Sequence, residues 1–388
     1  MRESTSLVFT GDIGFDHYMY KKWEDKYLLS KEILDFMHDS NHIVVNVEGP
    51  VSLSEKKDIE GKASNLLHTM EPGVADFLCD IKADIWNLCN NHIMDAKEAG
   101  LKDTLSIVSK KKVSSLGVGM NLEEASKPLF LNEAGGIGII SVGYQRACRK
   151  ADENTPGCFS WSDLELIEKR ISEIKEKCRW CIVVAHAGEE FTSLPTPYTR
   201  ERYLKYLEMG ADIIVAHHPH VPMNYETVGG KAIFYSLGNF IFDTDYQRSQ
   251  FNTEKGIVLK IKLNEDSFSF EAIGILTDRK NNHIIKNELP LIFTDVSPKE
   301  YELLEPLSAK AFIEATKRQQ IYLHPDKYSV NTTDEEWHEN FYEPLRSGRV
   351  PGETLDFQII VPIAEKEKEQ AWKNSTLDNV KEYILEQI

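Results

Sequence analysis

The stretch ADIIVAHHPHVP, residues 211–222, decides the fold because it joins a buried strand to a cluster of histidines. The apolar run 213–216 is typical of a buried strand, and His217, His218 and His220 follow it directly. Imidazole is the side chain that most often binds metals near neutral pH. We therefore predict a metal site at the end of this strand, and the alternative is a polar loop that happens to be rich in histidine.

Length and charge limit the classes of function. The chain has 388 residues, with 62 acidic and 45 basic side chains and a formal net charge of −17. The length favours one large domain with an appendage, or two domains. The negative charge argues against nucleic-acid binding, which depends on neutralising phosphates with Lys and Arg, and against docking on anionic lipid.

Targeting and membrane segments are not visible in the sequence. No apolar run approaches the length of about 20 residues that a membrane helix needs, and the apolar residues 7–9 are too few for a signal peptide. The six cysteines do not form a disulfide-rich pattern, and Cys181 of the pair Cys178 and Cys181 opens a strand, unlike a redox motif. We therefore expect a cytoplasmic protein with free thiols.

Strand-like apolar runs alternate with amphipathic helical patterns through about residue 276. The predicted strands are residues 7–10, 42–45, 85–89, 136–144, 181–186, 212–216, 256–263 and 268–276, and the predicted helices are residues 31–38, 72–81, 97–111, 161–178 and 197–209. A hairpin is expected to turn at Gly229–Gly230, Ser160 to cap the helix at 161–178, and Asp95 to cap that at 97–111. This alternation predicts an α/β sheet with helices over its faces.

Polar side chains stand at the ends of five predicted strands. They are Asp12, Asn46 with Glu48, Asn91 with His92, His186, and His218 with His220. In open α/β sheets ligands lie at the carboxyl ends of strands, so we expect these side chains to meet. Carboxylate and amide oxygens combined with imidazoles suit a pair of divalent metals that activates a water and binds a phosphoryl oxygen.

Structural readings of the same residues remain open. Asp12 could be a turn aspartate, Glu48 could cap a helix or turn, and Asn91 could belong to a hydrogen-bonded loop. We expect His217 to be a spacer or a packed ring, and not a metal ligand. The basic residues Arg146, Arg149 and Lys150 could bind an anionic substrate or simply be solvated.

Beyond about residue 285 the sequence becomes polar and helical in pattern, with few strand signals. We predict a first domain of residues 1–285 and an appended, mainly helical C-terminal region of residues 286–388.

Six motifs between residues 6 and 245 resemble the CapA family of bacterial capsule and poly-γ-glutamate synthesis proteins. In order they are GDI, VNVEGP, NLCNNHIMD, HAGEE, HHPHV and YSLGNF. That family belongs to the calcineurin-like metallophosphoesterase superfamily. The resemblance therefore implies a four-layer αββα sandwich of metallo-dependent phosphatase type, with a dinuclear centre of Mn, Fe or Zn.

The resemblance also implies roles for individual residues. Those that match the family's metal ligands are Asp12, Glu48, Asn91, His186, His218 and His220. One metal would be held by Asp12, Glu48 and His220, and the second by Glu48 with the remaining ligands. His92 would be the catalytic group that protonates a leaving group or stabilises charge. Glu189 and Asn239 would support the ligands.

This sequence departs from the family pattern at several positions. Ile13 and Gly14 follow Asp12 where the superfamily has Asp-x-His, so the first metal would lack a ligand unless Asp16 or His17 replaces it. Other departures, at Ala187, Ala216 and Lys97, do not fall on an expected ligand.

Two functions follow from these expectations. The first is a metal-dependent hydrolase or transferase that acts on a phosphoester or related bond of an anionic or polymeric small-molecule substrate in surface-polymer synthesis. The second is a non-catalytic polymer-binding or scaffold protein of a capsule or poly-γ-glutamate synthesis complex that keeps the fold. Family members are often membrane-anchored or exported, whereas no such segment is visible in this sequence.

Overall fold

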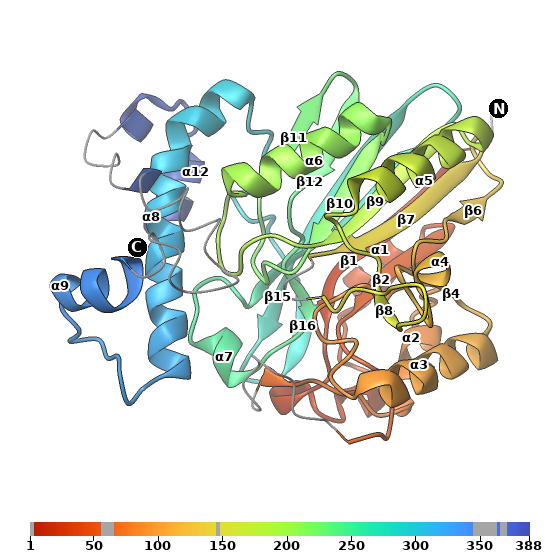
Figure 1. The fold of residues 1–388 in the computed structure, drawn as a ribbon, viewed down its shortest axis with the longest axis horizontal. Coiled ribbons are helices and arrows are strands. Elements are labelled where there is room, and N and C mark those ends of the chain that lie inside the picture. Colours follow the sequence, from red (N-terminus) through yellow and green to blue (C-terminus); the bar gives the residue numbers. More distant parts are fainter. Residues whose placement is uncertain (1–3, 56–65, 145–147, 344–362, 365–370) are drawn as a thin grey trace.

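Two β-sheets stack face to face, and helices cover their outer faces (Figure 1). The computed structural model describes residues 4–55, 66–144, 148–343, 363–364 and 371–388. The first sheet has the order β16-β15-β14-β1-β2-β3-β4, with β13 also paired to β1, and the second has the order β11-β12-β10-β9-β7-β6. The central strands β1, β2 and β3 are parallel to one another, as are β7, β9 and β10.

The strands of the first sheet are β1 (Thr5–Ile13), β2 (His42–Val47), β3 (Ile85–Asn87), β4 (Ser114–Leu116), β13 (Asn239–Ile241), β14 (Lys255–Leu263), β15 (Phe268–Asp278) and β16 (His283–Asn287). Those of the second are β6 (Leu129–Leu131), β7 (Ile137–Gly143), β9 (Trp180–His186), β10 (Ile213–His217), β11 (Tyr225–Val228) and β12 (Lys231–Phe234). A separate ribbon pairs β5 (Val118–Gly119) with β8 (Gly157–Cys158).

The α-helices are α1 (Lys31–His38), α2 (Gly73–Asp80), α3 (Lys97–Lys111), α4 (Leu122–Ala125), α5 (Leu164–Lys177), α6 (Pro197–Met209), α7 (Asp245–Arg248), α8 (Pro298–Leu323), α9 (Asp334–Trp337) and α12 (Asp378–Leu385). Short helical turns include η1 (His17–Met19), η2 (Lys22–Glu24), η4 (His338–Tyr342) and η6 (Ala371–Asn374).

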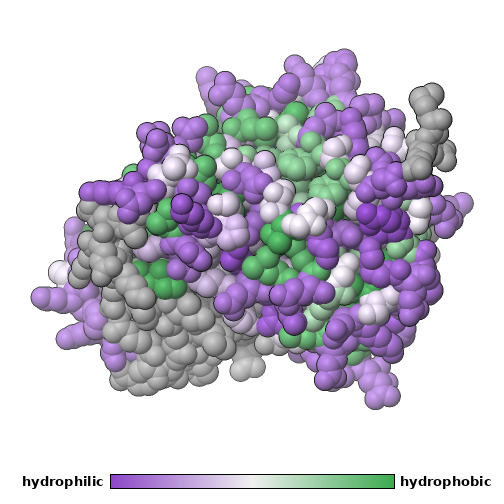
Figure 2. All heavy atoms as spheres, turned by 90° about the horizontal axis from the view of Figure 1, so that it is seen from above, coloured by the Kyte–Doolittle hydropathy of each residue, from purple (hydrophilic) through white to green (hydrophobic). Residues whose placement is uncertain are grey.

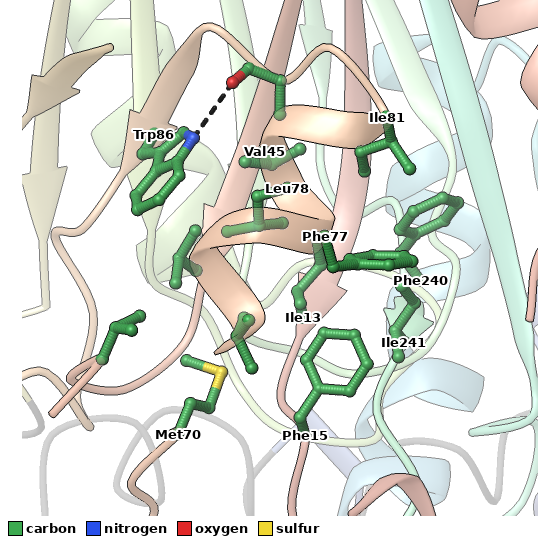
Figure 3. Close-up of a cluster of buried hydrophobic side chains, with 14 of the residues drawn as sticks. Ile13, Phe15, Val45, Met70, Phe77, Leu78, Ile81, Trp86, Phe240 and Ile241 are labelled. Atoms are coloured by element: carbon green, nitrogen blue, oxygen red, sulfur yellow. Dashed lines mark hydrogen bonds between the residues drawn. The ribbon is translucent and has the colours of Figure 1, made fainter. Parts of the chain in front are cut away.

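Three apolar cores separate the four layers. Side chains of α1, α2 and α3 pack on the outer face of the first sheet, and Figure 3 shows Phe77 and Leu78 of α2 beside Val45 of β2. Between the sheets lie residues such as Phe9 of β1 and Val184 of β9. A further core joins α5 and α6 to the second sheet. The predicted four-layer αββα sandwich is therefore confirmed.

Most predicted elements are confirmed to within a few residues, and the hairpin turns at Gly229–Gly230 between β11 and β12. The expected cap of α5 was wrong. The helix begins at Leu164, and its N-cap is Asp163, whose side chain accepts a hydrogen bond from the amide of Leu166. Ser160 lies too far before Leu164 to cap the helix, and its hydroxyl accepts a hydrogen bond from the amide of Ser162 instead.

The C-terminal region is mainly helical, as predicted, and α8 and α12 lie at one side of the sandwich (Figure 1). Ser297 caps α8, and Pro298 occupies its first turn. The last strand, β16, ends at Asn287, and the division into domains at residue 285 stays a prediction. Within the described residues, none of the helices combines the length and apolar character needed to span a bilayer. Hydrophilic side chains cover much of the face in Figure 2.

No disulfide joins the six cysteines, all of which lie in the part of the chain that the structure describes. Cys181 lies inside β9, and burial raises the pKa of its thiol to about 12. A thiol that stays protonated is a poor nucleophile, which argues against a redox role for the pair Cys178 and Cys181.

Gly11 permits a close approach of two chain segments directly beside Asp12. A Cβ atom at this position would lie 2.1 Å from the carbonyl oxygen of Gly238, and the amide of Asp12 donates to that same oxygen at 3.0 Å. Gly11→Ala is therefore expected to force the backbones apart and to lower the free energy of unfolding by about 1–3 kcal/mol. Urea unfolding monitored by circular dichroism measures this loss, and an unchanged midpoint would contradict the close approach.

Candidate metal centre

Neighbouring strands deliver polar side chains to one edge of the sandwich. Asp12 of β1 lies in register with Asn46 of β2 and with Asn239 of β13. In the second sheet, His186 at the end of β9 lies in register with His217 at the end of β10. The side chains that gather here are buried: Asp12, Asn46, Glu48, His92, His186, His217, His218, His220 and Asn239.

Asp12 lies in direct contact with the histidines of the HHPH segment. Its carboxylate oxygens are 3.2 Å from Nδ1 of His220 and 3.5 Å from Nδ1 of His217. The amide of His218 donates to Oδ2 at 3.4 Å. Burial alone would raise the pKa of Asp12, but the hydrogen bonds and charges of His217 and His220 outweigh it and hold the pKa well below its usual range. Asp12 is therefore present as a carboxylate.

Glu48 lies at the centre of the cluster and is fully buried. Its Oε1 is 3.6 Å from Nε2 of both His186 and His220, and 3.8 Å from Nε2 of His92. Two groups of potential ligands share this carboxylate: Glu48 with His218 and His220, and Glu48 with Asp12 and His186. Within each group the ligand atoms lie within 4.8 Å of one another. Glu48 is thus the residue that the two candidate groups have in common.

The two compact groups divide the histidines differently from the family pattern. The resemblance assigns His220 to the metal held by Asp12, whereas the compact groups place His186 with Asp12 and His220 with His218. His220 nevertheless also contacts Asp12. The assignment of each histidine to one metal therefore stays a prediction.

Asn239 orients His220. Its Oδ1 is 2.9 Å from Nδ1 of His220, and its own amide nitrogen donates to Gln247 and to the backbone of Thr253. With Nδ1 engaged, the Nε2 atom of His220 is the one that faces Glu48. A fixed partner on the far nitrogen is the usual support for a metal-binding histidine.

The backbone of the HHPH segment is strained. His218 and His220 have φ angles of 98° and 58°, in the left-handed region that residues other than glycine rarely adopt. Such strain costs on the order of 1–3 kcal/mol per residue and is concentrated at functional sites. Here it turns both rings toward the carboxylates.

The electrostatic environment favours a cation. Burial opposes the charged form of His220, but the charges of Glu48 and Asp12 raise its pKa to about 10. The pKa of His186 shifts in the opposite direction. Burial is the larger cause and the charge of His218 the next, and together they hold this pKa well below its usual range. Its Nε2 lies 2.9 Å from Oδ1 of Asn91. A neutral imidazole beside an amide oxygen and two carboxylates is a donor set that suits Mn, Fe or Zn.

His92 is held by a carboxylate at the edge of this cluster. Its Nδ1 is 2.7 Å from Oδ2 of Asp95, which also accepts a hydrogen bond from the amide of His68 at 2.7 Å. The prediction that Asp95 caps the following helix was wrong, because the N-cap of α3 is Ala96 and no side chain caps it. Asp95 instead fixes the ring of His92.

The proposed substitutes for the missing Asp-x-His histidine lie elsewhere. Asp16 is 2.7 Å from Nδ1 of His68, and the rings of His68 and His92 have centroids 4.1 Å apart. His17 is exposed. Asp16, which follows the first motif, therefore forms a second carboxylate-histidine pair with His68, next to His92.

The remaining predicted residues lie away from the ligands or outside the described residues. Glu189 accepts hydrogen bonds from the hydroxyl groups of Thr196 and Thr199, so it supports the start of α6. Arg146 lies outside the described residues. Arg149 and Lys150 are exposed, and Lys150 is 3.9 Å from Asp163.

A buried hydrogen-bonded chain lies behind Asp12, and of its members only Asn46 had been predicted to lie at the site. Asn46 donates to Asp12 at 2.8 Å, Asn87 donates to Asn46 at 2.7 Å, and Ser141 donates to Asn87 at 2.6 Å. Asn46 had been expected there because it stands at the end of a predicted strand, whereas Asn87 and Ser141 lie inside the predicted strands 85–89 and 136–144 and carried no such signal. Such a chain fixes the orientation of the carboxylate.

The sequence matches a family model described as bacterial capsule synthesis protein PGA_cap over residues 6–244. The PGA biosynthesis protein CapA of Bacillus subtilis (strain 168) is 33% identical over 250 residues, which cover 63% of this chain and 65% of that protein. The capsule biosynthesis protein CapA of Bacillus anthracis is 27% identical over 258 residues, which cover 64% and 62%.

A more distant relative is the probable polyglutamine synthesis accessory protein Rv0574c of Mycobacterium tuberculosis (strain ATCC 25618 / H37Rv), 23% identical over 189 residues, which cover 45% of this chain and 50% of that protein. The chain thus matches less than two thirds of the length of each of these curated relatives.

Proposed function

Because the chain belongs to the PGA_cap family of bacterial capsule synthesis proteins, we propose that it is a metal-dependent hydrolase or transferase that acts on a phosphoester or related bond in surface-polymer synthesis. The single observation that carries this proposal is the shared position of Glu48 in two compact groups of buried ligands. A carboxylate that bridges two divalent cations is the central element of sites that displace a group at phosphorus.

The residues around the bridge would have distinct tasks. Asp12, Asn91, His186, His218 and His220 would hold the metals together with Glu48, and two bound metals would supply an activated water and a clamp for the phosphoryl oxygens. Asn239 and the chain Ser141–Asn87–Asn46 would keep the ligands oriented. His92, fixed through Nδ1 by Asp95, would present Nε2 to the leaving group as a general acid.

Metal loading and hydrolysis of a model ester test this proposal directly. Protein purified without chelator is expected to contain close to two equivalents of Mn, Fe or Zn by plasma mass spectrometry, and to hydrolyse bis(p-nitrophenyl) phosphate. Removal of the metals is expected to abolish hydrolysis and to lower the unfolding temperature, since ligands that bind only the native state stabilise it. Protein that neither retains metal nor cleaves the ester after reconstitution with each metal would rule the proposal out.

A non-catalytic polymer-binding or scaffold role is the second candidate. Two observations favour it: the missing histidine of the Asp-x-His motif, and the name of one relative as a synthesis accessory protein. The double variant His218→Ala with His220→Ala separates the two roles in cells. If polymer synthesis continues after metal binding is lost, the scaffold role is correct, and if it stops in a protein that still folds, the enzymatic role is favoured.

A further inference from the structure

A pocket of about 110 Å³ lies beside the candidate metal centre. Asn91, His92 and His220 of the centre line it, together with Glu190 and Tyr246. Since a water molecule occupies about 30 Å³ of liquid volume, the pocket has room for roughly three or four water-sized groups. It is therefore suited to a small substituent next to the bond that reacts.

The pocket has an acidic and aromatic wall. Glu190 contributes a carboxylate, and Phe242 and Tyr246 contribute aromatic rings. The described lining contains no lysine or arginine, and its other titratable side chains are His68, His92 and His220, which lie on the side of the candidate metal centre. Aromatic rings together with a carboxylate attract cations and repel anions. This wall is therefore complementary to a positively charged substituent.

Helix α8 holds this wall in place. The side-chain amide of Gln319 donates to Oε2 of Glu190 at 2.9 Å, and the hydroxyl of Tyr246 donates to the same oxygen at 2.9 Å. The ring of Tyr322 lies against that of Tyr246, with centroids 5.3 Å apart. Figure 1 shows α8 running beside α7, the short helix that carries Tyr246.

Additional contacts join α8 to the segment that follows α7 and to the segment that precedes α6. Arg318 of α8 donates to Gln250, just after α7, at 3.1 Å. The hydroxyl of Tyr301, near the start of α8, donates to the carbonyl of Pro195 at 2.9 Å. The match to the family model ends at residue 244, so α8 lies outside the matched residues.

We propose that α8 completes the substrate pocket: Gln319 and Tyr322 position Glu190 and Tyr246, and Glu190 gives the pocket a preference for substrates with a cationic group next to the reacting ester. This inference rests on the proposed phosphoesterase function. It assigns the C-terminal region a role in specificity, with Glu190 as the residue that contacts substrate and Gln319 as a positioning residue.

Two phosphodiesters test the preference: p-nitrophenyl phosphocholine and p-nitrophenyl 3,3-dimethylbutyl phosphate, in which a neutral tert-butyl group replaces the trimethylammonium group. The full-length, Mn-loaded protein is expected to show a kcat/KM about tenfold higher for the choline ester, the size of a single partly desolvated cation contact. Glu190→Gln is expected to bring the two values together by raising KM for the choline ester alone. Equal values in the wild-type protein, or a preference that survives Glu190→Gln, would overturn the inference.

The role of α8 is tested with adjacent glutamines. Gln319→Ala is expected to reduce the preference severalfold and to speed hydrogen exchange in residues 189–196 and 244–250. Gln320→Ala is the matched control, because Gln320 has no hydrogen bond from its side chain in the part of the chain that the structure describes. If Gln319→Ala behaves like Gln320→Ala in both measurements, α8 does not position the wall.

Failure of the proposed function is distinguishable from failure of this inference. A metal-loaded protein that cleaves neither ester would contradict the proposed function. The charge preference is then decided by calorimetry with phosphocholine and 3,3-dimethylbutyl phosphate. Tighter binding of phosphocholine that depends on Glu190 would support the inference, and equal affinities would overturn it.

Discussion

Glu48→Gln is expected to remove both metals while the protein stays folded. Glu48 belongs to both groups of candidate ligands, and the substitution keeps its shape while it removes the negative charge that the two cations would share. Loss of a supporting group alone costs about 10–100-fold in metal affinity, so loss of the bridge is expected to exceed 100-fold. Metal content by plasma mass spectrometry and titration with Mn²⁺ by calorimetry measure the effect.

The metal-free protein should change much less than the metal-loaded protein. In the absence of metal, and against the opposing effect of burial, the charge of Glu48 raises the pKa of His220. Nε2 of His186 and of His220 lies 3.6 Å from Oε1 of Glu48, so the histidines partly compensate the buried carboxylate. We therefore expect the metal-free Glu48→Gln protein to stay folded and to unfold at a slightly lower urea concentration than the metal-free wild type. A variant that keeps both metals would contradict the bridging position.

Glu226 offers a matched control. It is as buried as Glu48, but it pairs with Arg200 at 2.6 Å and accepts the hydroxyl of Tyr235 at 2.8 Å. Removing one partner of a buried ion pair costs about 3–5 kcal/mol. Glu226→Gln is therefore expected to lose stability and to keep its metal affinity, which is the reverse of the expected behaviour of Glu48→Gln.

The fold could be predicted from the sequence because its core strands are short apolar runs that end abruptly. The runs before Asp12, His186 and His217 have no other reasonable interpretation than buried strands. Their parallel arrangement then brings the strand ends together without further information. The boundaries of helices were less predictable, as the cap of α5 shows: Ser160 and Asp163 are both residue types that cap helices, and only the start of the helix at Leu164 excludes Ser160.

The residues that support the candidate ligands could not be predicted in the same way. His68 follows a segment without periodicity, and its pairing with Asp16 depends on a contact between residues 52 positions apart. The pairing of Glu190 with Gln319 spans 129 positions. Such contacts arise from tertiary packing, and a local pattern in one sequence carries no trace of them.

His92→Asn is expected to lower kcat by about 10²–10⁴-fold, the range that a positioned general acid contributes, and to leave metal content unchanged. The ring is anchored through Nδ1 by Asp95 at 2.7 Å, and its Nε2 lies 3.8 Å from Glu48. This arrangement places Nε2 beside the metals without making His92 a necessary ligand. Steady-state kinetics with bis(p-nitrophenyl) phosphate, together with metal analysis of the same preparations, measure both quantities.

Asp95→Asn tests whether the orientation of the His92 ring, and not only its presence, contributes to catalysis. The substitution keeps the ring of His92 but weakens its anchor, so we expect a smaller loss of kcat, about 10–100-fold, as for other groups that orient a functional histidine. His42 provides the control. Its Nδ1 is also 2.7 Å from an aspartate, Asp84, but His42 is the first residue of β2, at the end of the strand that faces away from the candidate metal centre. His42→Asn is expected to leave kcat unchanged. Loss of metal in His92→Asn would show that His92 is a metal ligand. Full activity in both the His92 and the Asp95 variants would show that His92 does not take part in the reaction. Either result would exclude His92 as the general acid.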